Sequence, residues 1–585
     1  MKEFYALVDD HIQEYDNGTI PLSEDIPFSM KGTVKQITHY ILSKYLNGGS
    51  DNVDPVTKQR RPFRNIGNAI VDLEWRAKNI DRKSIEAHAL DGDYLFSLVV
   101  QKELHQWMKD NNFGETIDAI QRKESEYGSV LVKKTETKDE LVIEPVSWST
   151  ARVDPRDIAH GMKVDAHFLS PLELKEKRGV WEDESIDDVL AAAKKAFKSE
   201  KGEKRIEVLD IETQCEKRTV YPEEYDDNDE AGDEIALFNV ILAVVKDKKY
   251  CLYRTELKET RYKHKARKSV EGRDFGMGVW EELFEPQIWT NEAVIDERES
   301  LSLGGKVAIK TNKKNVPSAL SLMNGEIIEL DAGEYFEPVQ LRSNALPDFQ
   351  RVVDSWFQNT QRDQSAFPGV SGEEPKASTP GISLELQAAQ GGSIFNKRRD
   401  SDGFFLGEII VDWVMPFLIK RITKEHVLTA AYSKKELELI DRSIREMHSN
   451  AEAKENTLSG KLFTQDDKEA VELSVQQELD KQGNKRKLFI PKGWITLDKV
   501  KQKVRFDITD EMSDDQRRLN AIATALGNLP PGDPARVPLV EEMMEYSGLS
   551  PATFGISPSA SPAPASKPRA AKPTRVQEVL PAGQQ

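Results

Sequence analysis

The sequence predicts a large α+β protein, with helices and strands mixed in its first half and mostly helices in its second half. Apolar residues between Pro347 and Phe367 recur at positions i, i+3, i+4, i+7 and i+8, which is the spacing of one helix face. Tyr127–Lys134 and Leu141–Val146 flank a short polar turn, as the strands of a β-hairpin do. Ile382–Ile422 has the length and pattern of a long helix. At 585 residues, the chain is long enough for about three or four domains.

The first half also contains an acidic segment, Glu223–Glu234, between two expected strands. A calcium-binding loop needs glycine at its sixth position, but the sixth position from Asp226 is Ala231. It also needs glutamate at its twelfth position, but the twelfth position from Asp227 is Phe238. A solvated turn is therefore predicted. The elements expected around it are helices at Met30–Leu46, Ser84–Leu104, Ile117–Glu126 and Ile186–Lys198, strands at Arg205–Cys215 and Ala236–Val245, and an extended loop at Val153–Arg156.

Two helices are expected to flank a small β insert in the middle of the chain. Pro286 and Pro347 each stand where a first helical position would be, because the missing N–H costs nothing there. The first helix is expected over Gln287–Leu303, and Gly304 with the glycine after it can form the left-handed cap that ends it. The strands of the insert are expected at Lys306–Ile309 and Glu326–Leu330.

The chain after the second helix begins with a loop rich in Gly, Pro and Ser, Pro368–Gly381. The long helix that follows is expected to bend near Gly391, where two glycines are adjacent. The last segment, Ser557–Gln585, is rich in Pro, Ala and Ser and is expected to be disordered. Further elements are expected as helices at Lys434–Ser449, Thr464–Gln482 and Asp514–Leu526, with a β-like segment at Leu488–Asp507.

The motifs that mark common enzymes do not occur in the sequence. It has no Gly-x-x-x-x-Gly-Lys-Ser/Thr loop for phosphates, no His-Glu-x-x-His and no Gly-x-Ser-x-Gly. Cys215 and Cys251 are the only cysteines, which excludes a disulfide framework, and the histidines are scattered. We therefore expect no metal, no cofactor and no enzymatic activity. A hydrolase or nuclease built from dispersed carboxylates stays an alternative.

Charge and hydropathy bear on the partners. A net charge of −18 does not suit tight binding of DNA. The most apolar stretches, Ile235–Val245 and Phe404–Ile422, are too short or too interrupted by charges to span a bilayer. No N-terminal stretch has the pattern of a signal peptide. No membrane partner is therefore expected.

The block Gly276–Asn291, with the two helices and the β insert after it, resembles the centre of a tailed-bacteriophage portal protein. The hairpin from Tyr127 and the loop Pro368–Gly381 stand in the order of that family, and the similar blocks span Asn65–Ile422. The resemblance implies a portal fold. Its expected parts are a mixed α/β wing (1–270), a first stem helix region (271–305), a β clip (306–343), a second stem helix (344–367), a tunnel loop (368–381), a long kinked wing helix (382–430), a mostly helical C-terminal wing or crown region (431–556) and a disordered tail (557–585).

The resemblance also implies a function. Portal proteins form a homo-dodecameric ring at one capsid vertex, which is the channel for packaging and ejecting double-stranded DNA. The implied partners are the large terminase subunit, head-tail connector or adaptor proteins, the major capsid and scaffolding proteins, and DNA bound weakly and without sequence preference. The implied location is the virion, after assembly in the cytoplasm of a bacterial host. Another head-tail structural protein of different fold is an alternative.

Candidate site residues follow from these parts. In the clip, a basic first strand and an acidic second half either meet across a head-to-tail subunit contact or are solvated charges on a hairpin. The basic triplet at 397–399 either faces DNA or pairs with Asp400 and Asp402. The candidates for the DNA channel are Gln358, Gln361, Arg362, Lys376, Lys397, Arg398 and Arg399. The candidates for the clip that binds terminase and connectors are Lys306, Lys310, Lys313, Lys314, Glu326, Glu329 and Arg342.

Overall fold

The computed structural model describes part of the chain. The residues described are 1–23, 26–46, 52–53, 58, 60–82, 85–89, 94–137, 140–196, 205–225, 230–246, 248–304, 307–312, 333, 335–340, 351–352, 354–356, 358–359, 381–422, 425–428, 434–481, 486–489, 494–508, 522–523, 526 and 540. The expected tail and nearly all of the expected tunnel loop lie outside them.

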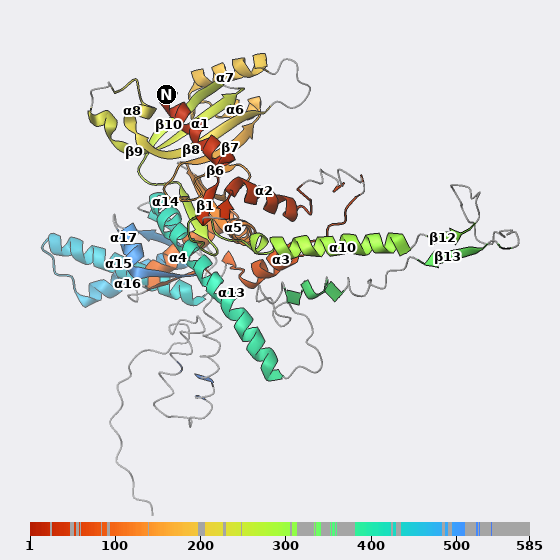
Figure 1. The fold of residues 1–585 in the computed structure, drawn as a ribbon. Coiled ribbons are helices and arrows are strands. Elements are labelled where there is room, and N and C mark those ends of the chain that lie inside the picture. Colours follow the sequence, from red (N-terminus) through yellow and green to blue (C-terminus); the bar gives the residue numbers. More distant parts are fainter. Residues whose placement is uncertain are drawn as a thin grey trace, which may run out of the picture. The chain divides into compact units, whose positions relative to one another are not determined.

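Helices and antiparallel sheets together build the fold, so the predicted α+β class is confirmed (Figure 1). The chain divides into two compact units. The larger unit is Met1–Lys424 with Ile490–Thr509, and the smaller unit is Glu425–Phe489 with Asp510–Gln585.

A five-stranded antiparallel sheet forms one layer of the larger unit, in the strand order β10-β9-β8-β7-β6. Alternate residues of β9 face opposite sides: Val240 and Leu242 join a core with α1, whereas Ile241 joins a core with α7. The sheet is thus covered on both faces. The predicted strands at 205–215 and 236–245 are confirmed as β8 and β9. The bounds are β6 Ala151–Val153, β7 Lys163–Leu169, β8 Ile206–Glu216, β9 Ile235–Val245, β10 Lys248–Leu257, α1 Lys2–Asn17, α6 Pro171–Glu176, α7 Asp183–Ala196 and α8 Lys217–Val220.

A three-stranded sheet in the order β11-β4-β5 contains the predicted hairpin, which is confirmed as β4 and β5. Helix α5 enters β4 through Gly128, whose φ is 82°. A Cβ at Gly128 would lie 2.1 Å from the backbone nitrogen of Gly278, so only glycine fits this turn. The bounds are β4 Ser129–Glu136, β5 Leu141–Pro145, β11 Tyr262–Ala266, α2 Met30–Ile41, α3 Gly67–Ala77, α5 Phe113–Tyr127 and α9 Val279–Glu282.

The helix predicted at 84–104 is wrong in its first part. The chain forms β3 at Glu86–Ala89, and helix α4 runs over Tyr94–Asp110. Strand β3 pairs with β16 at Val504–Asp507, more than four hundred residues later in the chain. A pairing at that separation leaves no local sequence signal. The β-like segment predicted at 488–507 is also partly wrong, because α17 (Leu497–Lys503) precedes β16.

Helix α10 (Phe284–Gly304) confirms the helix predicted at 287–303, and Gly304 is its last residue. It begins two residues before Pro286, so Pro286 lies inside the first turn, where proline is still tolerated. Strand β12 (Val307–Thr311) then pairs antiparallel with β13 (Phe336–Gln340). The strand predicted at 326–330 lies outside the described residues. Residues 351–352, 354–356 and 358–359 are helical, as predicted for the second stem helix.

Helix α13 (Gly381–Ile409) continues through a π turn (Ile410–Val414) into α14 (Met415–Arg421). Near Gly391, where a bend was predicted, the helix continues without a break. The irregularity falls instead before Pro416, whose ring has no N–H for the carbonyl of Asp412. The N–H of Met415 bonds to the carbonyl of Ile410, so the backbone widens at this point.

The smaller unit contains a helical hairpin, α15 (Lys434–Leu458) with α16 (Gln465–Lys481), and a strand pair, β14 (Glu425–Leu428) with β15 (Arg486–Phe489). Both predicted helices are confirmed, although α15 extends to Leu458. Gly460, with φ 75°, ends α15, and the side chain of Asp467 accepts the N–H of Thr464 at 2.9 Å at the start of α16. Among the described helices of the chain, none is long and apolar enough to cross a bilayer.

Candidate functional site

The candidate channel residues are only partly described. Gln358 is a helical residue and lies exposed, and Lys397 lies exposed on α13. Arg398 and Arg399, the next two residues of α13, are partly buried. The remaining candidates, Gln361, Arg362 and Lys376, lie outside the described residues.

The candidate clip residues are described at one position. Lys310 lies in β12, and the register places it opposite Glu337 of β13. One basic and one acidic position therefore stand in register within one chain. The proposed contact between subunits stays a prediction. The positions that lie outside the described residues are Lys306, Lys313, Lys314, Glu326, Glu329 and Arg342.

Arg398 of the basic triplet belongs to a buried group of charged side chains, which we call the helix cluster. It joins α13 to α3, α5, α9 and the end of β11. Four of its side chains are acidic and four are basic, so full ionisation gives no net charge. The cluster consists of Glu74 of α3, Lys78 just after α3, Glu124 of α5, Lys265 of β11, Arg267 just after β11, Glu282 of α9, and Arg398 and Asp402 of α13.

The inner half of the helix cluster surrounds Asp402. Lys265 bridges Glu124 Oε1 at 2.7 Å and also contacts the carboxylate of Asp402. Lys78 contacts Glu124 and lies 3.6 Å from Asp402 Oδ2. Gln121 donates from Nε2 to Asp402 Oδ2 at 3.0 Å. Both lysines therefore lie between carboxylates from two different helices.

The outer half of the helix cluster surrounds Glu74. Arg267 holds this carboxylate with two parallel hydrogen bonds, Nε to Oε1 at 2.8 Å and Nη2 to Oε2 at 2.9 Å. Its Nη1 lies 3.0 Å from Glu282 Oε2. Arg398 donates from Nη1 to Glu74 Oε2 at 2.7 Å. For Arg398 the pairing interpretation of the basic triplet therefore holds, although the partner is Glu74 and neither Asp400 nor Asp402.

Burial and mutual charge set the protonation of the helix cluster. Burial, reinforced by the charge of Glu124, raises the pKa of Asp402 to about 6. The carboxylates of Asp402 and Glu124 share two cations, because Lys78 and Lys265 each contact both of them. Although burial opposes it, the attraction of Lys78 and Lys265 lowers the pKa of Glu124. Despite its burial, the pKa of Lys78 is raised by Glu124, Asp402 and Glu74. Asp402 is thus the member that gains a proton on mild acidification.

Sequence reasoning missed most of the helix cluster. It considered Asp402 only as a neighbour of the basic triplet. The available signal was the spacing i, i+4 of opposite charges, which occurs for Glu74 with Lys78 and for Arg398 with Asp402. That spacing is usual on solvated helices, so it does not indicate burial.

A second buried group, the sheet cluster, joins the five-stranded sheet to the three-stranded sheet. Lys133 Nζ lies 2.6 Å from Asp210 Oδ2 and 3.2 Å from Asp165 Oδ2. Arg261 Nη2 lies 2.9 Å from Asp210 Oδ1. Against the effect of burial, Lys133 and Arg261 lower the pKa of Asp210 to about 2. The sheet cluster consists of Lys133, Lys163, Asp165, Asp210, Glu212 and Arg261.

The base of α10 is fixed by two buried amides. Gln287 accepts the N–H of Ile66 at 3.0 Å and donates to the carbonyl of Arg64 at 2.6 Å. Asn291, one turn later, accepts the N–H of Arg64 at 2.9 Å. These bonds hold the extended segment before α3 along the helix, so they set where α10 leaves the core.

One Ser–His pair has the spacing of a nucleophile and its base. Ser129 Oγ lies 3.1 Å from His264 Nε2. Ser129 is fully buried, and its Oγ accepts the N–H of Gly276 at 2.8 Å. Burial lowers the pKa of His264 to about 4. The pair therefore joins β4, β11 and the segment at Gly276 at a place that no substrate can reach.

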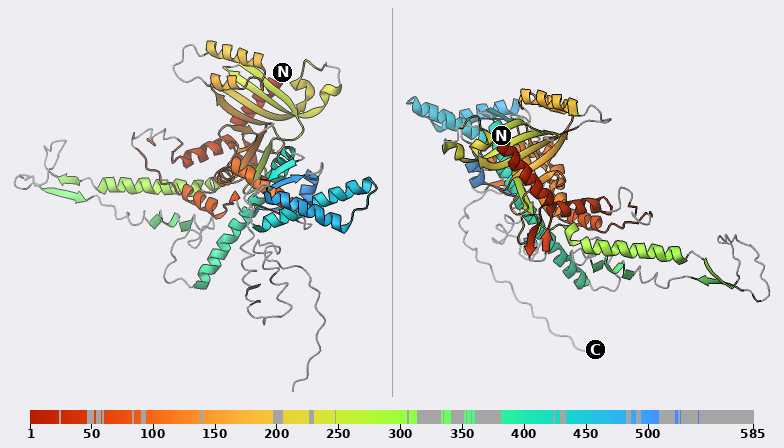
Figure 2. Two further views of the ribbon diagram at one scale, coloured as in Figure 1. Left: turned by 180° about the vertical axis from the view of Figure 1, so that it is seen from behind. Right: turned by 45° about the horizontal axis from the view of Figure 1, so that its top comes forward.

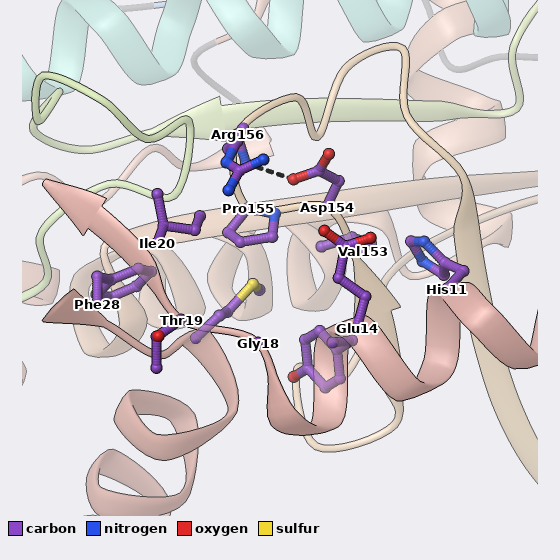
Figure 3. A pocket seen from close by; sticks show the side chains of 12 residues that line it. His11, Glu14, Gly18, Thr19, Ile20, Phe28, Val153, Asp154, Pro155 and Arg156 are labelled. Carbon is purple, nitrogen blue, oxygen red and sulfur yellow. Dashed lines mark hydrogen bonds between the residues drawn. The ribbon is translucent and has the colours of Figure 1, made fainter.

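An open hollow lies between the end of α1, strand β1 (Ile20–Ser23) and the turn after β6 (Figure 3). Its apolar lining includes Ile20 and Phe28, and Asp154 Oδ1 accepts the backbone N–H of Arg156 at 2.9 Å. The ring of His11 contacts the carbonyl of Arg152, and burial lowers its pKa. His11 is bonded to the backbone of β6 and Asp154 to the backbone of the turn after it, so we assign no chemistry to the hollow.

Within the described residues, no group of three or more His, Cys, Asp and Glu side chains has the geometry to hold a metal ion. No protein-family model and no curated protein matches this chain. Its function is therefore argued from its own residues and their geometry.

Proposed function

We propose that the chain is a portal subunit, copies of which form a dodecameric ring at one capsid vertex for the packaging and ejection of double-stranded DNA. One arrangement carries the proposal. Helix α10 leads to the β12–β13 hairpin, a second helical segment at 351–359 follows, and α13 comes next (Figure 2). This is the order of stem helix, clip, stem helix and wing helix in the portal family, which the sequence resembles.

Exposed apolar side chains on these helices support assembly. Ile288 and Trp289 of α10 are 36% and 49% exposed, and Val352 of the second segment is 44% exposed. The neighbouring side chains Ile288 and Trp289 offer apolar surface that contact with another copy would cover. A head-to-tail contact repeated around a closed ring would cover every such surface.

The fixed base of α10 and the helix cluster support a channel wall of constant shape. Gln287 and Asn291 hold α10 to the core, and Arg398 with Asp402 holds α13. The net charge of −18 per chain would repel DNA from most of the wall, which favours passage over tight binding. Lys397 and Gln358, both exposed, are the described candidates for weak DNA contact.

The partners follow from the same proposal. The clip around β12 and β13 would bind the large terminase subunit during packaging and head-tail connector proteins afterwards. The wing would contact the major capsid and scaffolding proteins in the bacterial cytoplasm, and the finished ring would stay in the virion. No catalytic residue is assigned.

Electron microscopy and mass photometry of the purified chain test the proposal. We expect rings of about twelve copies with an open centre. The variant Ile288→Ser with Trp289→Ser should lower the fraction of rings, because it removes the apolar surface of α10. Val180→Ser, which changes a 70% exposed side chain outside α10, is the matched control. A chain that stays monomeric or dimeric at high concentration would overturn the proposal.

A further inference from the structure

One side of helix α10 is exposed and acidic. Its members recur at intervals of three and four residues, which places them on one helix face. None of its four carboxylates forms an ion pair with a residue that the structure describes. Carboxylates at this spacing repel each other, so a cation from outside would stabilise the helix. We call this surface the acidic face, and it consists of Glu285, Ile288, Trp289, Glu292, Asp296 and Glu299, all exposed.

The opposite side of α10 holds a segment of opposite charge. Gln287, Asn291 and Arg298 of α10 all bond to the backbone of this segment. The helix period places these three residues about half a turn away from the acidic face. The segment, 58–64, contains no acidic residue. We call it the basic loop, and its exposed basic side chains are Lys58, Arg60, Arg61 and Arg64.

The backbone of the basic loop is fixed, although its basic side chains are exposed. The N–H of Arg61 donates to the carbonyl of Asn52 at 2.8 Å, and the hydroxyl of Tyr45 donates to the carbonyl of Pro62 at 2.7 Å. The ring of Phe63 packs edge-on against that of Tyr45, with the ring centroids 5.1 Å apart. The loop is thus preorganised, which lowers the entropy that its side chains lose when they meet a partner.

We propose that the acidic face of one subunit binds the basic loop of the next subunit. The two surfaces lie on opposite sides of one helix, so they cannot pair within one chain. They are complementary, since four carboxylates would meet four basic side chains. A contact between two different surfaces of identical chains is heterologous, and its repetition can close a ring.

The composition of the acidic face favours a second copy of this chain as the occupant. Arginine forms paired hydrogen bonds with carboxylates, and its planar guanidinium also stacks on aromatic rings. Arg60 and Arg64 could therefore bind the carboxylates and cover the ring of Trp289 in the same contact. DNA phosphates would also attract the basic loop, but they would leave the acidic face and its apolar side chains uncovered. The inference rests on the proposed ring and adds which surfaces meet in it.

Charge reversal in the full-length chain tests the contact, with ring formation followed by electron microscopy and mass photometry. Each variant below puts like charges on both sides of the contact. The fraction of chains in rings should therefore fall about tenfold, at a concentration at which the unmodified chain forms rings. The loop variant is Arg60→Glu, Arg61→Glu and Arg64→Glu, and the face variant is Glu292→Lys, Asp296→Lys and Glu299→Lys.

Mixing the two variants gives the sharper result. In an equal mixture, the loop of each variant meets an oppositely charged face on the other, so rings should return. Alternation of two variants requires an even number of subunits, which a dodecamer has. A chain that carries all six changes should also form rings by itself. A matched control with three reversed charges on α6 and α7 should form rings like the unmodified chain; it is Lys175→Glu, Lys194→Glu and Lys195→Glu.

The outcomes separate this inference from the proposed function. If the unmodified chain forms no rings, the proposed function fails together with the inference. If it forms rings and both variants form them equally well, the inference alone fails. It also fails if the loop variant loses DNA binding but keeps its rings, or if the mixture restores none. Circular dichroism checks folding. If the face variant does not fold, the neutral change Glu292→Gln with Asp296→Asn replaces it and should still lower the ring fraction.

Discussion

The helix cluster and the sheet cluster both bury carboxylates close together, but different interactions stabilise them. In each, buried carboxylates from two elements come close together. In the sheet cluster, the register places Asp165 directly opposite Asp210 on β7 and β8, and Lys133 Nζ reaches both. Against the effect of burial, the pKa of Asp165 is lowered by its hydrogen bond with His167 and by Lys133, and that of Asp210 is lowered by Lys133 and Arg261. In the helix cluster, Asp402 and Glu124 share Lys78 and Lys265, and the pKa of Asp402 is raised by its burial.

The difference shows what secondary structure contributes to a buried charge. Strand pairing fixes the sheet cluster, because hydrogen bonds of the ladder hold β7 and β8 whatever the side chains do. The helix cluster has no such ladder, so its own ion pairs contribute to holding α13 in place. We therefore expect the sheet cluster to need all of its charges. In the helix cluster, Asp402 can instead take up a proton when a neighbouring cation is lost.

The largest effect is expected from Lys133→Met. This change leaves Asp165 and Asp210 facing each other without the cation that lies between them. Breaking one buried pair in this way should lower the free energy of unfolding by about 3 kcal/mol. Urea denaturation followed by circular dichroism measures it, with the exposed Lys194→Met on α7 as the control. An effect as small as that of the control would show that strand pairing alone holds this region.

A smaller effect is expected from Lys78→Met, the equivalent change in the helix cluster. Loss of this cation raises the pKa of Asp402 further, so the carboxyl group stays protonated and its burial costs less. The free energy of unfolding should fall by about 1 kcal/mol at pH 5 and about 2 kcal/mol at pH 8, where ionisation of Asp402 is forced. The same denaturation experiment at both pH values measures the difference. An equal loss at pH 5 and pH 8 would contradict the adaptive role of Asp402.

Local patterns in the sequence predicted much of the fold. The hairpin at β4 and β5, the strands β8 and β9 and helix α10 follow from periodicity, glycine and proline, which act over a few residues. Strand β3 was predicted as helix because its partner β16 lies far away in sequence. The bend was placed at Gly391 because two glycines weaken a helix, but the proline after the π turn had the stronger effect.

The candidate sites were less predictable for a related reason. A charged residue has the same appearance in a sequence whether it is solvated or buried, and only packing decides between the two. Arg398 illustrates this, since its neighbour Lys397 is exposed while Arg398 reaches Glu74 of α3. Most predicted clip positions lie outside the described residues, so their roles stay predictions.

The smallest effect is expected from Arg398→Gln, and it separates the two roles that the basic triplet could have. Glu74 keeps its two hydrogen bonds from Arg267 and one from Ser125, so loss of Arg398 should cost only about 1 kcal/mol. Lys397→Gln, one residue away and exposed, should leave the free energy of unfolding unchanged within about 0.5 kcal/mol.

DNA binding measured at increasing salt should show the opposite order of effects for these two variants. Lys397→Gln should reduce the salt dependence, because it removes a cation that is available to phosphate, whereas Arg398→Gln should leave it unchanged because that guanidinium is bound to Glu74. The opposite result would be that Arg398→Gln weakens DNA binding and leaves the free energy of unfolding unchanged. Arg398 would then belong to the channel surface, and the helix cluster would hold α13 through Asp402 alone.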